Sequence, residues 1–341
     1  MQELTFVEAG KIEWRDAKMP VLGGAGEALV KPLAVSRCDL DWVIARGKAP
    51  VPGSFPLGHE CVGEVLDVGD AVTHTKPGDR VIVPFQISCG TCARCVKGRT
   101  GSCASVPKLA AYGLGPLGGG STYGGALSDV LRVPYADAML VRLPDGMDPI
   151  AAAALGDNAV DGFRTVAGPL AREPGAKVLV AAGGAPSIAL YAVASAVALG
   201  ASEVVYVDPN EQRAALAEKL GARAVRAKCD DTLRVGRFPI TVDATAREEG
   251  LRFALRNTDV YGECTSVGVY FGDVALPMLE LYTRGVRFTT GRVNLRGDLP
   301  SMLGAIAERG LELGLVATSV ASRADAAAAW TEAATKLVIS M

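Results

Sequence analysis

The chain has 341 residues, more than a single hydrophobic core usually holds and enough for two domains. Hydrophobic residues make up 49% and charged residues 21%, as in globular proteins, so extensive disorder is not expected. A net charge of −2 gives no electrostatic basis for binding nucleic acid or an anionic membrane. There is no secretory signal pattern, and the longest apolar run, 188–199, is too short to span a bilayer, so a cytoplasmic protein is expected.

The N-terminal part of the chain has a β-rich pattern, with short apolar runs between glycine, proline and aspartate turn signals. Runs of this kind are 28–30, 61–68 and 80–85. A glycine-rich stretch, 113–125, is expected to form a mobile loop.

From about Pro174 the pattern changes to strands that alternate with helices. The expected strands are 178–182, 204–207, 240–242, 264–267 and 286–289, and the clearest helical segments are 187–199 and 210–220. This alternation predicts a parallel sheet wound in both directions. The final segment, from about Asp298, is expected to be mainly helical.

Four of the eight cysteines follow one another in the pattern C-x2-C-x2-C-x7-C. They are Cys89, Cys92, Cys95 and Cys103. Four thiolates on one short loop can fill every position of a tetrahedral zinc ion, which would make the site structural. An iron–sulfur cluster and a disulfide pair are the competing interpretations.

A glycine-rich turn follows the expected strand 178–182 and precedes a helix, an arrangement that binds the pyrophosphate of a dinucleotide. The turn departs from a strict G-x-G-x-x-G pattern and comprises Gly183, Gly184, Ala185, Pro186, Ser187 and Ile188. Asp208 ends the next strand, where an acidic side chain binds the adenosine ribose and repels a 2′-phosphate, so NAD is favoured over NADP. Arg213 lies near enough to affect this preference, but we expect it on an exposed helix face.

Three further features complete an ordered set. Cys38 and the segment Gly58-His59-Glu60 precede the cysteine cluster, and Asp157 precedes the nucleotide-binding pattern. Each is weak alone, since Asp157, for example, also suits a helix cap. Together with the cluster and the glycine-rich turn, they resemble the zinc-dependent medium-chain dehydrogenases of the alcohol dehydrogenase superfamily over essentially the full chain.

The resemblance implies an α/β protein with two domains. A GroES-like, β-rich catalytic domain would comprise 1–157 and 296–341 and would carry the structural-zinc lobe at about 86–106. A Rossmann domain with a doubly wound parallel sheet would span 158–295 and bind NAD. The implied enzyme is an NAD(P)-dependent zinc alcohol dehydrogenase, a homodimer or homotetramer with two zinc ions per chain, acting on a small-molecule alcohol or aldehyde.

The resemblance also assigns residues by position. The catalytic zinc ligands would be Cys38, His59 and Asp157, which leaves the fourth position for substrate oxygen. Glu60 would be an occasional ligand, and Asp41 would accept the second ring N–H of His59. The nicotinamide would lie against Val267-Gly268-Val269 and Thr290-Gly291-Arg292. A largely apolar substrate pocket would be lined by Leu40, Trp42, Phe85 and Asn294.

The proton path departs from the family pattern. A serine or threonine two residues after the first zinc cysteine usually takes the alcohol proton, and Leu40 stands there. A relay histidine found in some relatives is replaced by Val43. The alternatives are Asp39, Glu60, Asp161, a ribose hydroxyl and water. Two other functions therefore stay open: a formaldehyde-type aldehyde dehydrogenase or dismutase, and a zinc- and nucleotide-binding homologue without turnover.

Overall fold

The computed structural model of the chain describes residues 1–120 and 123–341, which divide into two units. Unit 1 comprises Met1–Asn158, Asn294–Pro300 and Ala317–Met341, and unit 2 comprises Ala159–Val293 and Ser301–Val316. The predicted domain boundaries at 157/158 and 295/296 stay a prediction. Of the predicted loop 113–125, residues 121 and 122 lie outside the described residues. Among the described helices, none is long and apolar enough to cross a membrane.

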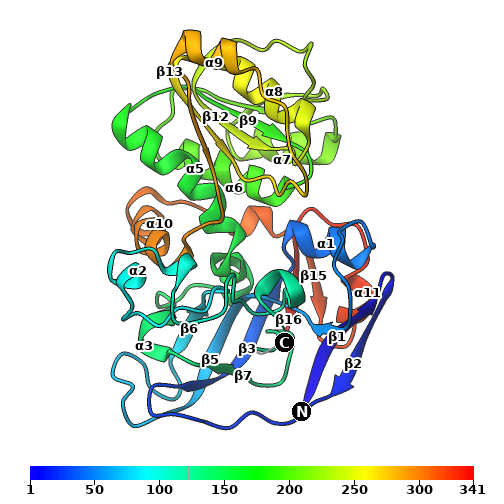
Figure 1. Ribbon diagram of the computed structural model, residues 1–341, viewed down its shortest axis with the longest axis vertical. Coiled ribbons are helices and arrows are strands. Elements are labelled where there is room, and N and C mark those ends of the chain that lie inside the picture. Colours follow the sequence, from blue (N-terminus) through cyan, green and yellow to red (C-terminus); the bar gives the residue numbers. More distant parts are fainter. Residues whose placement is uncertain (121–122) are drawn as a thin grey trace. The chain divides into compact units, whose positions relative to one another are not determined.

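Unit 1 is built on two sheets, as its β-rich sequence predicts (Figure 1). The smaller has the order β2-β1-β4, from Lys11–Asp16, Gln2–Glu8 and Phe55–Pro56. The larger has the order β15-β16-β3-β5-β6-β8, with β7 also paired to β3. Its strands are β3 Ala28–Ser36, β5 Glu60–Val68, β6 Arg80–Val83, β7 Leu131–Val133, β8 Val141–Arg142, β15 Ser319–Ser322 and β16 Leu337–Ser340.

The helices of unit 1 are short. They are α1 Asp39–Ala45, α2 Ala93–Val96, α3 Ala136–Met139, α4 Pro149–Ala152 and α11 Ala326–Ala329, with 3₁₀ turns η1 Thr100–Ser102, η2 Gly115–Gly118 and η3 Ala153–Gly156. Side chains alternate between core and surface along much of β3, and the inward ones join a core that includes Leu4, Tyr112 and Trp330. This core fixes the strand ends from which the metal-binding candidates project.

The prediction of a mainly helical C-terminal segment is only partly right. Its first part is a helix, α10 Leu295–Arg309, whose residues are divided between the two units. Residues 317–341, by contrast, contribute two strands, β15 and β16. The apolar run Leu337–Ser340 pairs antiparallel with β3, and β15 pairs with it in turn. Pairing with an existing sheet therefore favours strands at both ends of this segment, while the alanine-rich sequence between them keeps only the short helix α11.

Unit 2 contains a six-stranded sheet in which every pairing is parallel. The order is β11-β10-β9-β12-β13-β14, from Arg223–Val225, Val204–Val207, Val178–Ala182, Phe238–Ala244, Thr258–Ser266 and Arg287–Thr290. Its helices are α6 Pro186–Ala198, α7 Glu211–Lys219, α8 Glu248–Asn257 and α9 Met278–Arg284, with η4 Gly314–Val316; α5, Asn158–Arg172, leads into it. The predicted parallel sheet is confirmed.

The helices of unit 2 form two groups around this sheet (Figure 1). The first group, α6 and α7, packs together over the β9–β11 side, and the second, α8 and α9, packs together over β12 and β13. The chain therefore winds outward in both directions from the neighbouring strands β9 and β12. In sheets of this kind ligands bind beyond the carboxyl ends of the strands, where the winding direction changes.

Candidate functional site

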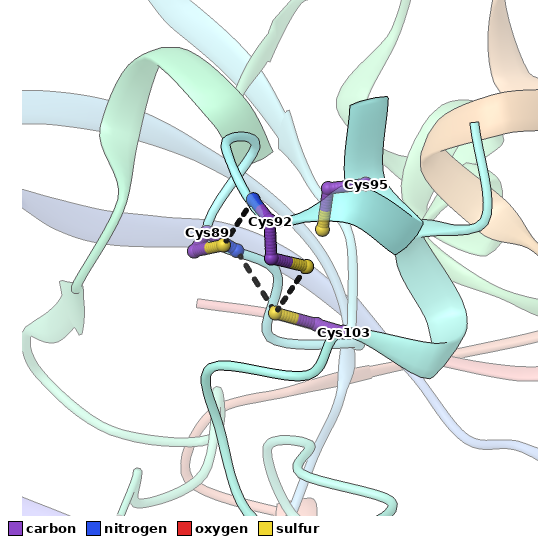
Figure 2. A group of neighbouring side chains, drawn as sticks. All are labelled: Cys89, Cys92, Cys95 and Cys103. Carbon is purple, nitrogen blue, oxygen red and sulfur yellow. Dashed lines mark hydrogen bonds between the residues drawn. The ribbon is translucent and has the colours of Figure 1, made fainter. Parts of the chain in front are cut away.

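The four clustered cysteines face one another in unit 1. Their Sγ atoms all lie within 4.8 Å of one another, and Figure 2 shows them directed toward a common point. The Sγ atoms of Cys92 and Cys103 are 3.9 Å apart, and all eight cysteines are free thiols. A disulfide needs a separation of about 2.05 Å, whereas a zinc tetrahedron with bonds of about 2.3 Å has edges of about 3.8 Å. The geometry fits zinc and does not fit a disulfide.

Hydrogen bonds at the cysteine cluster favour negative sulfur. Burial opposes ionisation of Cys89, but hydrogen bonds, first that with the Ser105 hydroxyl, lower its pKa to about 5. The backbone N–H of Ala104 lowers the pKa of Cys92 to about 7. Burial raises the pKa of Cys95 to about 12. These hydrogen bonds favour the thiolate form of Cys89 and Cys92, which is the form in which cysteine binds a metal ion.

Asn294 holds the loop that carries these cysteines. Its Oδ1 accepts hydrogen bonds of 3.0 Å from Thr100 Oγ1 and from the backbone N–H of Gly101, and its Nδ2 donates to Gly98 O. The backbone N–H of Leu295 donates to the side chain of Gln86 over 3.3 Å. The amide of Asn294 therefore serves the lobe, and its predicted place in the substrate pocket stays a prediction.

Replacing Asn294 with alanine is expected to loosen the lobe. It removes three hydrogen bonds and leaves the partly buried N–H of Gly101 without an acceptor, at a cost of about 1–3 kcal/mol in folding free energy. We expect faster release of one zinc ion to a chromogenic chelator, with little change in the KM of the substrate. A raised KM with unchanged zinc release would contradict this and favour the pocket role.

A second cluster in unit 1 joins residues that are far apart in the sequence. Its members are Cys38, His59, Glu60 and Asp157, all buried, with potential ligand atoms within 4.8 Å of one another. Cys38 lies between β3 and α1, and Asp157 directly follows η3. Glu60 is the first residue of β5, and His59 directly precedes it. The structure thus brings together the four residues that the sequence singled out.

Two glycines allow these segments to approach. Gly58 has a φ of +89°, which favours glycine, and an added Cβ would lie 2.8 Å from Leu127 N. An added Cβ at Gly156 would lie 2.7 Å from Cys61 N and 2.8 Å from Glu60 Cα. The turn that presents Asp157 can therefore lie directly on β5 only because residue 156 has no side chain.

His59 lies in a negative environment. Its Nε2 is 3.4 Å from Asp157 Oδ2 and its Nδ1 is 3.6 Å from Asp41 Oδ1, but within the described chain neither buried nitrogen makes a hydrogen bond. Burial alone would lower the pKa of His59, but the carboxylates of Asp41, Asp157 and Glu60 raise it to about 9. Burial, and then the charge of Asp157, raise the pKa of Cys38. A dication would offset this charge and would give a buried imidazole nitrogen a partner, so the residues fit zinc.

Glu60 has a buried cation beside it that the sequence did not reveal. Lys336 Nζ lies 2.7 Å from both carboxylate oxygens, and both side chains are fully buried. Ser36 Oγ donates to Glu60 Oε2 over 2.6 Å, since the register of β3 and β5 sets Ser36 opposite Glu60. Lys336 also donates to Arg37 O, next to Cys38. In the sequence, the only sign of this role is that a basic residue precedes an apolar run. Its pairing with Glu60 follows only once β16 is known to pair with β3.

The predicted pocket residues on α1 and just after β6 lie near this cluster. The ring centroids of Phe85 and His59 are 5.5 Å apart, so Phe85 packs beside the imidazole. Leu40 lies in the first turn of the helix that begins after Cys38 and packs against the core of unit 1. Trp42 is part of the same helix and is partly buried. The substrate pocket that these residues were expected to line stays a prediction.

The glycine-rich turn of unit 2 lies against the end of β12. A Cβ added to Gly183 would lie 2.9 Å from Thr245 Cα, and one added to Gly184 would lie 2.9 Å from Ala246 Cβ. Gly184 N donates to Thr245 O over 2.8 Å, and α6 starts directly after Ala185, with proline at its first position. This close, helix-opening turn at the carboxyl edge of a parallel sheet is a cradle that fits a nucleotide pyrophosphate.

The prediction that Arg213 lies on an exposed helix face is wrong. Its side chain is 21% exposed and forms an ion pair with the fully buried Asp208, with Nε 2.6 Å from Oδ2. Asn210 caps α7 by accepting the backbone N–H of Arg213, and its own N–H donates to Asp208, so the first turn of the helix starts beside this carboxylate.

A buried aspartate that the sequence did not single out organises the same edge. Asp243 Oδ2 accepts hydrogen bonds of 2.7 Å from Ser266 Oγ and from Tyr270 Oη, and its Oδ1 accepts from the N–H and hydroxyl of Thr245. Asp243 thereby ties the end of β12 to the segment after β13, which contains the predicted Val267-Gly268-Val269. In the sequence, the feature that could have indicated this role is the position of Asp243 near the end of an apolar strand.

The second predicted nicotinamide segment follows β14. Gly291 has a φ of +148°, and its carbonyl oxygen accepts a 2.7 Å hydrogen bond from Arg164 Nη2 on α5. Arg164 also pairs with Asp161, with Nε 2.6 Å from Oδ1. The chain beside Arg292 is therefore held to α5, while the roles of Gly291 and Arg292 toward a coenzyme stay predictions.

Comparison with known proteins matches both parts of the chain. Residues 24–145 match the family described as an alcohol dehydrogenase GroES-like domain, and residues 187–308 match the one described as a zinc-binding dehydrogenase. L-threonine 3-dehydrogenase of Streptomyces coelicolor is 30% identical over 338 residues, 94% of this chain and 92% of that protein. The medium chain reductase/dehydrogenase ucsI of an Acremonium species is 33% identical over 233 residues, 67% of this chain and 76% of that protein. Alcohol dehydrogenase TADH from Thermus sp. ATN1 is similar in structure, with a TM-score of 0.88 and 26% identity over 100% of this chain and 99% of that one.

Proposed function

Because this chain belongs to the zinc-dependent medium-chain dehydrogenase/reductase family, we propose that Cys38, His59 and Asp157 form its catalytic zinc centre. As a member of this family, the chain is a zinc-dependent oxidoreductase that transfers hydride between small-molecule alcohols or carbonyls and a nicotinamide coenzyme. The predicted GroES-like and Rossmann parts are confirmed with it. The residue assignment depends on one observation: one thiol, one imidazole and two carboxylates are buried together with ligand atoms within 4.8 Å.

The zinc centre would work as follows. Zinc supplies Lewis-acid chemistry when bound, since it lowers the pKa of a substrate hydroxyl and polarises a carbonyl. Cys38, His59 and Asp157 would hold the ion and would leave one position for that oxygen. The carboxylate of Asp41 lies 3.6 Å from Nδ1 of His59, so with zinc bound through Nε2 it would be the group that accepts the other ring N–H. Phe85 shields the same ring from water.

The coenzyme would bind at the carboxyl edge of the parallel sheet. Gly183 and Gly184 let the chain pass close to β12, and the N-terminus of α6 favours the negative pyrophosphate. Asp208 directly follows β10, where an acid would meet the adenosine ribose of NAD, the coenzyme that the sequence favours. Leu40 offers no exchangeable proton, so the proton of the alcohol leaves through another group.

A coenzyme absorbance assay tests this function. The panel should contain hydrophobic alcohols and aldehydes, L-threonine, and formaldehyde, with NAD or NADH in excess. We expect turnover with at least one hydrophobic alcohol–aldehyde pair in both directions, because the predicted pocket residues are largely apolar, and loss of turnover after zinc chelation. Full zinc occupancy without turnover on any substrate would contradict the proposal and favour a binding protein. A cytoplasmic location and a homodimer or homotetramer remain predictions.

A further inference from the structure

The carboxylate of Asp208 is already fully engaged within unit 2. Its Oδ1 accepts hydrogen bonds from Asn210 N at 2.9 Å and from Arg213 Nη2 at 2.8 Å. Its Oδ2 accepts from Tyr206 Oη at 2.8 Å and from Arg213 Nε at 2.6 Å. A carboxylate has about four lone-pair positions for hydrogen bonds, so these four donors fill it.

Arg213 also cancels the charge of this carboxylate. The two parallel hydrogen bonds form the bidentate arrangement in which a guanidinium binds an acid most strongly. Asp208 is fully buried, so water does not screen the pair from that side. The acid that ends β10 is therefore neither an uncommitted acceptor nor an unbalanced negative charge.

Both properties matter for the choice between coenzymes. An acidic residue at this position favours NAD because it accepts hydrogen bonds from the ribose hydroxyls and repels a 2′-phosphate. Pairing with Arg213 weakens both effects. The guanidinium fork also matches phosphate geometry, and the side chain of Arg213, being 21% exposed, can present it to solvent.

We propose that Arg213 sets the coenzyme preference of this chain, so that the enzyme binds NADP(H) as well as NAD(H). The proposal rests on the proposed use of a nicotinamide coenzyme by unit 2. Paired with Asp208, Arg213 removes the repulsion of a 2′-phosphate. With NADP(H), its guanidinium turns toward the 2′-phosphate and shares its hydrogen bonds between the phosphate and Asp208.

The test measures binding of both reduced coenzymes to the zinc-loaded full chain. Dissociation constants for NADH and NADPH are obtained from the fluorescence of the bound nicotinamide. In the wild type the two constants should lie within about tenfold of each other. In Arg213→Gln the NADPH constant should rise at least about tenfold relative to that of NADH, because a buried carboxylate then faces the 2′-phosphate alone.

Three further variants make the test specific. Asp208→Asn removes the carboxylate charge but keeps Arg213, so the preference should shift toward NADPH. Arg213→Lys keeps the positive charge but not the two parallel N–H donors of the guanidinium. Its ratio of the NADPH to the NADH dissociation constant should therefore lie between those of the wild type and Arg213→Gln. It also serves as the readout if Arg213→Gln does not fold. Arg223→Gln is the matched control, because Arg223 pairs with Glu203 at the opposite ends of these strands and should leave the ratio unchanged.

The outcomes separate this proposal from the proposed function. Wild-type enzyme that binds NADH but excludes NADPH, or an Arg213→Gln variant in which both constants change equally, would overturn the role of Arg213 alone. Wild-type enzyme that binds neither coenzyme would overturn the proposed function and this proposal together. Binding of 2′,5′-ADP against 5′-AMP repeats the comparison on the adenosine half, without any contribution from catalysis.

Discussion

Replacing Asp157 with alanine is expected to remove one of two zinc ions per chain and to lower kcat/KM by more than about a hundredfold. The reason is the donor set, since Asp157 Oδ2 lies 3.4 Å from Nε2 of the buried His59, in a cluster that also contains Cys38. Loss of a residue that only supports a ligand typically costs about 10–100-fold in metal affinity, so loss of a ligand should cost more. Zinc per chain by mass spectrometry or atomic absorption, beside kcat/KM, gives the measurement.

Two variants control for general damage. Asp157→Cys should keep both zinc ions and part of the activity, because a thiolate can fill the same tetrahedral position. Cys92→Ala should also lose one zinc ion, but from the lobe. Because that site is structural, the melting temperature should fall while the rate at saturating substrate changes little. An Asp157→Ala enzyme with both zinc ions and full activity would show that the ligand assignment is wrong.

Local spacing explains why the metal-binding candidates could be predicted. Cys89 and Cys103 belong to one short loop, so their distance in sequence limits their distance in space. Cys38, His59 and Asp157 could be linked only through resemblance, because their approach depends on β3–β5 pairing and on the close contact of Gly156 with β5. A pattern along the chain does not contain the register of two strands.

The features that escaped prediction depend on distant segments or on side-chain direction. Lys336 reaches Glu60 because β16 pairs with β3, and the alanine-rich sequence before it suggested a helix instead. Arg213 could be assigned to a helix from the sequence, but helical periodicity alone did not indicate that it turns toward Asp208. Asn294 was assigned by family position, yet its amide is used by a loop almost two hundred residues earlier in the chain.

Replacing Lys336 with methionine is expected to lower the free energy of unfolding by about 3–5 kcal/mol. Both Lys336 and Glu60 are fully buried, and removing one partner of a buried ion pair leaves a charge that water does not reach and that has lost its directly bonded counter-charge. Urea unfolding of zinc-loaded enzyme at fixed zinc concentration gives the measurement. The matched control is Lys228→Met, which breaks an exposed pair with Glu249 and should cost less than about 1 kcal/mol.

The pH dependence and a double variant identify the cause of that loss. Burial raises the pKa of Glu60, and the charge of Lys336 opposes this rise. Without the lysine, the pKa of Glu60 in the folded chain rises further above its value in the unfolded chain, so the destabilisation should grow as the pH increases. Glu60→Gln with Lys336→Met should recover much of the loss, because neither member of the pair then carries a buried charge. A single variant that loses the same free energy at every pH, and that Glu60→Gln does not rescue, would show that lost packing of the lysine stem is responsible instead.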